Sequence, residues 1–118
     1  MAAKRPGTKA RGSSTGRPIM VLLDLLGERW TLRILWELAA GRASFRELRE
    51  RCDAVSPTLL NRRLRSLREA RLIDHAGDGY GLTEKGAELA AEFANLDRWA
   101  KDWAASLVTS PERQKRHG

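Results

Sequence analysis

Residues 56–70 have the sequence SPTLLNRRLRSLREA, and this stretch decides the fold. Ser56 suits the N-cap of a helix, and Pro57 suits the first helical position because its φ is preset and its missing N–H would have no partner there. At about 100° per residue, one narrow stripe of this helix collects three leucines, namely Leu60, Leu64 and Leu67. The sequence therefore predicts an amphipathic helix that packs through its leucines.

The other side of the predicted helix is polar. It carries Thr58, Asn61, Arg62, Arg65 and Glu69. A charged helix face is usually only a solvated surface. Arginine and asparagine, however, bond guanine and adenine edges through two hydrogen bonds, and an α-helix fits the major groove of DNA. The residues of this helix alone leave both interpretations open.

Charge in the rest of the chain is concentrated at the two ends. The 118 residues carry a formal net charge of +7, which favours a polyanionic partner. Residues 1–17 contain five basic residues and no acid, residues 109–118 are also basic, and charges balance between them. We expect a disordered basic tail at 1–17, one domain at 18–108 and a basic tail at 109–118. The positive field of the domain is then local to the helix at 56–70.

Several kinds of site are not expected in this sequence. The single cysteine, Cys52, excludes an intramolecular disulfide, and it cannot form a zinc site with only His75 and His117. No apolar run approaches the ~20 residues that span a bilayer. We find no nucleophile and base at suggestive spacing and no phosphate-binding glycine loop. We therefore expect a cytoplasmic protein that is not an enzyme and needs no metal or cofactor.

Three further helices are expected before residue 56. The first runs from Pro18 to Leu26, and its abundant apolar surface favours contact with a partner. The second spans 29–40 and carries five apolar residues that are expected to be mostly inward: Trp30, Leu32, Ile34, Leu35 and Leu38. Ser44 and Glu47 match a capping box, which starts a third helix over 45–52. A turn of about three to four residues then leads into the helix at 56–70, and this spacing is typical of a helix-turn-helix.

The chain after residue 70 predicts a β-hairpin and a long helix. Residues 71–76 and 80–83 resemble short strands around a glycine-rich turn at 77–79. A helix from Glu84 to about Leu107 then carries an apolar stripe longer than a small core can cover. We expect this stripe and the first helix to form a two-fold dimer interface, with Leu22, Leu25, Leu26, Leu96, Trp99, Trp103 and Leu107. The alternative is that the helix bends back onto its own domain.

Four motifs in this order resemble one family. The segments are LGERWTLRIL at 26–35, FREL at 45–48, the recognition-helix pattern from Val55 to Leu67, and YGLTEKG at 80–86. Together they resemble the HxlR family of bacterial transcriptional regulators over roughly residues 22–103. The resemblance implies a mainly α winged helix-turn-helix with a small β-hairpin, which dimerises through its N- and C-terminal helices. It also implies binding of double-stranded DNA as a homodimer, with the helix at 56–70 in the major groove.

The DNA-contacting residues that we predict lie on this helix. They are Ser56, Pro57, Thr58, Asn61, Arg62, Arg63, Arg65 and Arg68. Arg62 and Arg65 are expected to contact bases or nearby phosphates, and Thr58 and Asn61 to add short-range readout. Arg63 and Arg68 would hold the DNA backbone if they are exposed.

The sequence departs from the family in two places. Some relatives sense electrophiles or oxidants through a cysteine before the first helix, where this chain has none. Cys52 falls on the apolar side of the third helix, so a buried role is expected and a thiol switch is not. The predicted wing has no Lys or Arg between Ile73 and Tyr80, only His75 and two aspartates. A basic wing tip that grips phosphate is therefore not expected.

Two other functions remain open at this stage. The chain could be a nonspecific DNA-binding protein that relies on its basic tails, which deletion of residues 1–17 would reveal as a loss of nearly all affinity. It could also be a protein-interaction module with a winged-helix fold. A small-molecule effector in an apolar pocket at the dimer interface, near Trp30, Trp99 or Trp103, also stays open, but packing explains these tryptophans better.

Overall fold

The computed structural model describes residues 16–108. The predicted tail at 1–17, apart from its last two residues, and the predicted tail at 109–118 lie outside this part of the chain. The described elements are α1 (Pro18–Leu26), α2 (Thr31–Ala39), α3 (Phe45–Arg51), α4 (Pro57–Glu69), β1 (Ile73–Ala76), β2 (Gly79–Leu82) and α5 (Glu84–Val108). This order of mostly helical elements around one hairpin is that of a winged helix-turn-helix, which confirms the predicted fold class.

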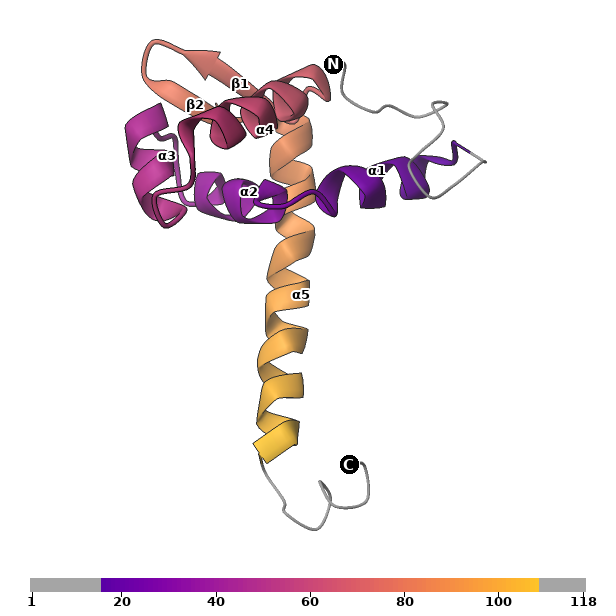
Figure 1. Ribbon diagram of the computed structural model, residues 1–118. Coiled ribbons are helices and arrows are strands. Elements are labelled where there is room, and N and C mark those ends of the chain that lie inside the picture. The colour runs from indigo at the N-terminus through magenta and orange to yellow at the C-terminus, as the bar shows by residue number, and fades with distance from the viewer. Residues whose placement is uncertain (1–15, 109–118) are drawn as a thin grey trace.

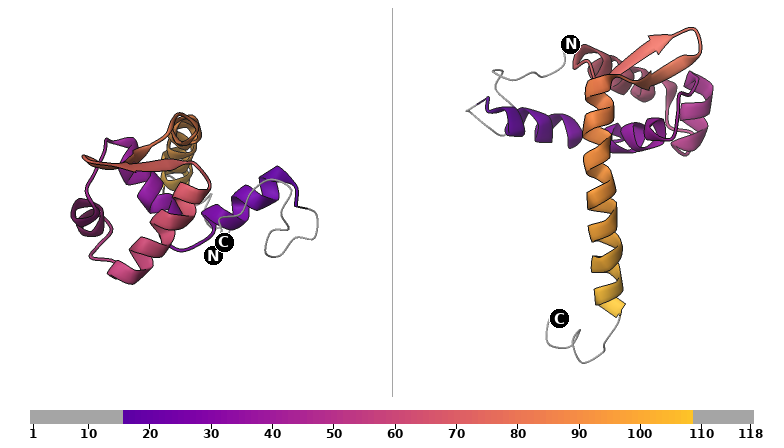
Figure 2. Two further views of the ribbon diagram at one scale, coloured as in Figure 1. Left: turned by 90° about the horizontal axis from the view of Figure 1, so that it is seen from above. Right: turned by 180° about the vertical axis from the view of Figure 1, so that it is seen from behind.

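The elements form a head from which two helices project (Figures 1 and 2). We define the head as α2, α3, α4, the hairpin and the first turns of α5. α1 extends to one side of the head, and α5 continues away from it. We call residues 96–108 of α5 the stalk, because none of them is buried. The head is thus the part that has its own core, and the two projecting helices leave apolar surface uncovered.

The core of the head is formed by the apolar stripes that the sequence predicts on its helices. Its fully buried side chains include Ile34, Leu35, Leu48, Leu60, Leu64 and Leu67. The three leucines of α4 lie in this core together with residues from α2 and α3, so α4 is fixed along its length. Burial of a leucine contributes about 1.5–3 kcal/mol, which makes this contact the main anchor of α4.

Two expectations for the first helices are wrong in detail. α2 begins at Thr31 and not at Arg29, because Trp30 has a φ of +78°, in the left-handed region that a right-handed helix cannot include. Leu32 is 44% exposed rather than inward. It lies two residues from Ile34, which is about 200° around the helix and therefore on the opposite face.

The predicted hairpin is present, but its turn has two residues and not the predicted three, because Gly79 pairs with Ala76, and the hairpin makes an additional contact. β1 and β2 pair antiparallel, with His75 opposite Tyr80 and the turn at 77–78. Ala43, in the segment before α3, also bridges to Tyr80: the Tyr80 amide donates to the Ala43 carbonyl at 2.7 Å, and the reverse bond measures 3.0 Å. The wing is therefore tied to the start of the helix-turn-helix as well as to the end of α4.

Candidate nucleic-acid interface

The N-terminus of α4 is capped as the sequence predicts. The Ser56 hydroxyl accepts a hydrogen bond from the Leu59 amide at 3.0 Å, and Pro57 occupies the first turn. This cap satisfies one of the amides that a helix start leaves without a partner. The first turn of α4, where the predicted reading residues begin, is thus well ordered at the surface.

Most of the predicted DNA-contacting residues share the exposed face of α4. The exposed members are Ser56, Pro57, Thr58, Asn61, Arg62, Arg65 and Arg68. Their position opposite the buried leucines gives α4 one face that packs and one that presents hydrogen-bond donors. This arrangement has the chemistry that base and phosphate recognition needs.

Arg63 differs from the other arginines of α4. Its side chain is half-buried, and its Nε donates to the carbonyl of Arg29 at 2.8 Å. The predicted contact of Arg63 with the DNA backbone required an exposed side chain, and the Arg63 side chain is only partly exposed. In the structure Arg63 ties α4 to the connection between α1 and α2.

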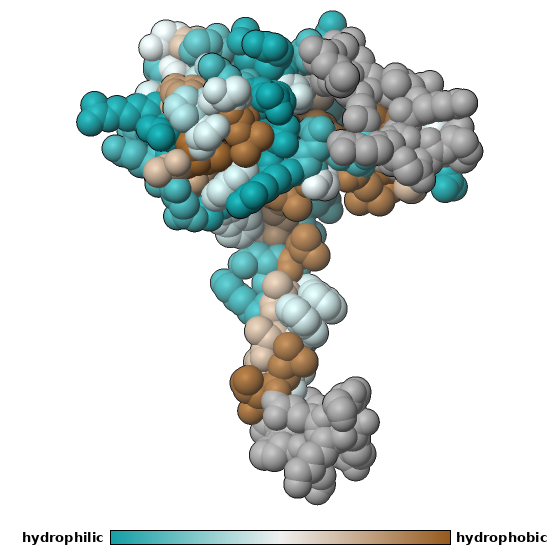
Figure 3. Space-filling view, in the orientation of Figure 1, coloured by the Kyte–Doolittle hydropathy of each residue, from teal (hydrophilic) through white to brown (hydrophobic). Residues whose placement is uncertain are grey.

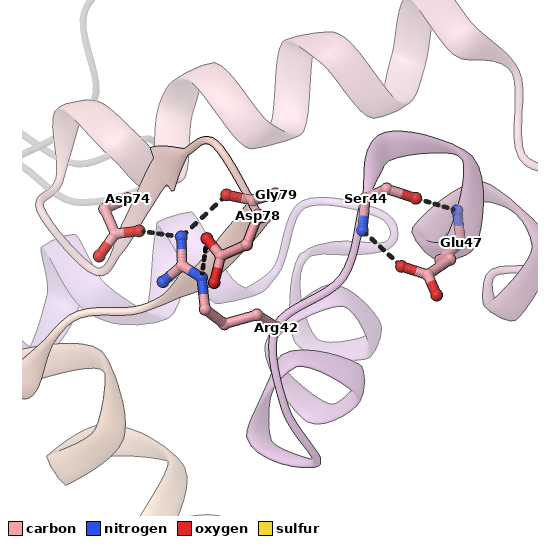
Figure 4. A network of polar contacts seen from close by, with 6 residues as sticks. All are labelled: Arg42, Ser44, Glu47, Asp74, Asp78 and Gly79. Atoms are coloured by element: carbon pink, nitrogen blue, oxygen red, sulfur yellow. Dashed lines mark hydrogen bonds and ion pairs between the residues drawn. The ribbon is translucent and has the colours of Figure 1, made fainter.

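A capping box fixes the start of α3, the first helix of the helix-turn-helix. The Ser44 hydroxyl accepts from the Glu47 amide at 3.1 Å, and the Ser44 amide donates to Glu47 Oε1 at 2.8 Å (Figure 4). The bond from the Ser44 amide lowers the pKa of the Glu47 carboxyl below its ordinary value. The ionised form of Glu47 therefore stabilises the fold.

We expect the Glu47→Gln variant to lose stability only where Glu47 is ionised. Because the folded pKa of Glu47 is lowered, its contribution is fully present above the ordinary glutamate pKa and disappears as the pH falls through the folded pKa. The difference in free energy of unfolding between wild type and variant, from urea titrations, should be positive near neutral pH and shrink on acidification. A difference that stays constant across this range would show that the charge of Glu47 has no part in the cap.

The turn between α3 and α4 is held by arginines that the sequence analysis did not single out. Asp53 and Ala54 have φ values of +55° and +57°, in the left-handed region. Arg49 Nε donates to the Val55 carbonyl at 2.8 Å, and Arg33 of α2 donates to the carbonyl of Arg51. These bonds satisfy carbonyls at and beside a turn with two left-handed residues.

The wing contains a second arginine contact that the sequence analysis missed. Arg42, in the segment between α2 and α3, reaches the hairpin and donates from Nη2 to Asp74 at 2.7 Å and from Nε to Asp78 at 2.7 Å (Figure 4). Its Nη2 also donates to the Gly79 carbonyl at 2.8 Å. The hydrogen bond with Asp74 raises the pKa of Arg42 above its already high ordinary value. The acidic wing is thus paired with a permanently charged guanidinium from outside the hairpin.

The wing lies beside the exposed face of α4. One hollow is lined by Asn61 of α4, by His75 and Asp78 of the hairpin, and by Ser44 and Phe45 at the start of α3. His75 also stacks on Tyr80 of the facing strand, with ring centroids 4.0 Å apart. The predicted reading face and the wing therefore border one continuous surface.

The stalk and α1 carry the predicted dimer-interface residues, with one correction. On α5, Leu96, Trp99, Trp103 and Leu107 are 61%, 60%, 51% and 48% exposed. Figure 3 shows apolar surface on α5 beyond the head. On α1, however, Leu25 belongs to the core of its own chain, and Leu22 and Leu26 are half-buried. The more exposed apolar side chains of α1 are Ile19 and Leu23. Leu25 is thus a core residue, because α1 packs this edge against the head.

Cys52 lies in the core of the head, as the sequence predicts. Cys52 is fully buried, and this burial raises the pKa of its thiol, which disfavours the reactive thiolate.

A hollow between α2 and α5 is lined by Trp36 and by alanines of both helices. Trp30, Trp99 and Trp103 do not line this hollow.

Within 16–108, no group of three or more histidine, cysteine, aspartate or glutamate side chains is arranged to hold a metal ion. In the same part of the chain, no helix has the length and apolar character needed to cross a membrane.

Comparison with known proteins decides the family. The model of the HxlR-like helix-turn-helix family matches residues 25–107. The chain belongs to this family. The HTH-type transcriptional regulator Rv3095 of Mycobacterium tuberculosis is 34% identical over 124 residues, which cover 99% of this chain and 75% of the relative. The HTH-type transcriptional regulator YodB of Bacillus subtilis is 31% identical over 99 residues, covering 78% of this chain and 88% of YodB.

Solved structures of YodB share the fold of this HxlR-family protein. The quinone-bound form from B. subtilis aligns with a TM-score of 0.66 at 32% identity, covering 71% of this chain and 96% of that chain. The reduced form aligns with a TM-score of 0.59 at 29% identity, covering 76% and 90%. The predicted membership of the family is confirmed, and the protein is a DNA-binding transcriptional regulator with a winged helix-turn-helix.

Proposed function

We propose that this HxlR-family regulator binds a specific double-stranded DNA sequence as a homodimer, with α4 of each subunit in the major groove. The observation that carries the proposal is the exposed donor face of α4, which stands opposite a fully buried leucine stripe. A helix fixed in this way presents its side chains with little loss of conformational entropy on binding. Since a bacterial regulator of this kind acts on the chromosome, we place it in the cytoplasm.

Dimerisation is supported by the apolar residues of the stalk. Trp99 and Trp103 stack on one another, with ring centroids 5.8 Å apart, yet more than half of each side chain is exposed. Aromatic side chains left uncovered on a helix that projects from the head are typical of an interface and not of a monomer surface. A two-fold axis near the stalk would present two copies of α4 to successive major grooves, about one helical turn apart.

Selection of bound sequences from a random duplex pool, at one stated salt concentration, tests this proposal. We expect a pseudo-palindromic sequence whose half-sites are centred about 10 base pairs, or a multiple of this spacing, apart. Recovery of no preferred sequence by correctly folded protein would contradict the proposal. Neutralising Lys4, Arg5, Lys9 and Arg11 with glutamine should lower affinity and salt dependence but leave the selected sequence unchanged. If nearly all affinity were lost instead, binding would be nonspecific and driven by the basic N-terminal segment.

We expect Arg62→Ala to weaken binding to the selected site by about 1–3 kcal/mol and to relax the preference at one base pair of each half-site. Arg62 is exposed on the reading face, so its removal deletes donors without opening the core. Affinities for the selected and for scrambled duplexes, measured by fluorescence anisotropy, check this. Lys101→Ala is the control, because it removes one positive charge from the stalk. Equal loss on both duplexes would assign Arg62 to a phosphate and not to a base.

A further inference from the structure

The wing of this protein is acidic, and its charge is compensated from elsewhere in the fold. Residues 73–82 contain Asp74 and Asp78 but no lysine or arginine. The side chains of Asp74 and Asp78 are 49% and 66% exposed. DNA is strongly negative, so two carboxylates beside a DNA-reading face oppose binding unless a positive group compensates them.

The guanidinium of Arg42 binds both carboxylates. Nη2 lies 2.7 Å from Asp74 Oδ1, and Nε lies 2.7 Å from Asp78 Oδ1. The two acids belong to β1 and to the turn, so one rigid guanidinium spans the hairpin (Figure 4). A lysine could not reproduce this arrangement, because its ammonium is a single point charge without a planar fork.

The hairpin is shaped to receive Arg42. A Cβ atom at Gly81 would collide with the Arg42 side chain, so the absence of a side chain there leaves the space in which Arg42 lies. A Cβ atom at Gly79 would collide with the carbonyl of Ala43, the residue next to Arg42. The paired backbone bonds between Ala43 and Tyr80 hold this segment against β2. Arg42 is therefore part of a built contact and not a surface side chain that meets an acid by chance.

The contact lies next to the reading face of α4. Asp78 and Asn61 line the same hollow, and Ser44, two residues from Arg42, lines it too. Charges that border the reading face act on bound DNA over a Debye length, which is about 10 Å at 0.1 M salt. The Arg42 contact therefore changes the electrostatic potential at the backbone of bound DNA.

We propose that Arg42 is a positioning residue for DNA binding, which holds the wing beside α4 and compensates the charges of Asp74 and Asp78. This role rests on the proposed binding of DNA through α4. It accounts for a wing that lacks basic residues of its own: Arg42, from the segment before α3, offsets one of the two negative charges of the wing, and the arginines of α4 supply the attraction.

The test compares four variants with the wild type on the selected duplex at about 50 mM salt, where electrostatic effects are large. Arg42→Ala should weaken binding on the order of tenfold, and Arg42→Lys should weaken it less. The triple variant R42A/D74N/D78N should bind more tightly than Arg42→Ala, because it removes the two charges that Arg42→Ala leaves uncompensated. Lys101→Ala is again the control for the loss of one positive charge.

A second measurement does not depend on DNA. Hydrogen exchange of the Tyr80 amide, which bonds the Ala43 carbonyl, should be faster in Arg42→Ala than in wild type, while amides within α4 should be unchanged.

The results separate this role from its alternatives. Wild-type binding by Arg42→Ala would overturn compensation by Arg42. A triple variant as weak as Arg42→Ala would show that the charges of Asp74 and Asp78 do not oppose binding, and it would also overturn charge compensation by Arg42. If wild-type protein selects no DNA sequence, the proposed function fails. The Tyr80 amide then still decides whether Arg42 positions the wing, with faster exchange supporting this role and unchanged exchange overturning it.

Discussion

Replacing Trp99 and Trp103 together with glutamate is expected to convert the protein from a dimer to a monomer and to weaken binding to a site with two half-sites by roughly 10²–10⁴-fold. Both tryptophans project from the stalk and are 60% and 51% exposed in the single chain, so the substitutions leave the core of the head intact. Two glutamates in a two-fold interface would place four carboxylates in an apolar contact, which is strongly unfavourable. Each monomer would then bind its half-site without the gain from a linked partner.

Sedimentation equilibrium and DNA titration of the same samples measure the two parts of this prediction. The control is Ala105→Glu, which adds a carboxylate to an exposed position on the other side of the stalk, about 200° from Trp103. It should remain dimeric. A double variant that is still a dimer, with circular dichroism equal to that of wild type, would show that the tryptophans do not form the interface.

Leu64→Ala is expected to lower the free energy of unfolding by about 3 kcal/mol, within the 2–5 kcal/mol typical of such truncations. Leu64 lies in the middle of α4 and is 1% exposed, so the smaller side chain leaves a cavity where α4 meets the core. The matched control is Leu32→Ala on α2, where the leucine is 44% exposed and a loss below about 1 kcal/mol is expected.

Urea denaturation at one fixed protein concentration compares these variants, because the stability of a dimer depends on concentration. Equal losses at the two positions would contradict the burial pattern of the head. A small loss at Leu64 alone would mean that α4 is not anchored by its leucine stripe.

The elements that the sequence predicts well are those with local signals. The helix at 56–70 has a capping serine, a proline in its first turn and a leucine stripe, and α4 spans Pro57–Glu69. The capping box at Ser44 and Glu47 and the hairpin with its glycine-rich turn are also local patterns, and both are confirmed, although the turn is one residue shorter than predicted. Such signals survive in the fold because tertiary packing agrees with them.

The inward face of α1 could not be predicted in the same way. Nearly all of its residues are apolar, so helical periodicity does not distinguish Leu25, which is buried, from Leu23, which is exposed. The orientation of α1 is decided by the geometry of its contact with the head. The start of α2 could not be predicted either, because nothing in the residue type of Trp30 indicates a positive φ.

The arginine contacts of the head could not be predicted from the sequence either. Arg42 and Asp78 are 36 residues apart, and Arg63 bonds a carbonyl 34 residues away. Hydrogen bonds to backbone carbonyls leave no periodic pattern, and a charged residue in a loop resembles any solvated one. The sequence therefore predicts the hydrogen-bond donors on α4, but not which arginines already donate to other groups of the protein.

The most direct test of the central claim, that α4 reads bases in the major groove, is dimethyl sulfate protection on the selected duplex. This reagent methylates guanine N7 in the major groove and adenine N3 in the minor groove, so it separates the two modes of contact. Protection of guanine N7 in two patches about one helical turn apart is predicted, with one guanine per half-site exposed again in Arg62→Ala. Protection confined to adenine N3, or an unchanged N7 pattern in Arg62→Ala, would contradict the claim.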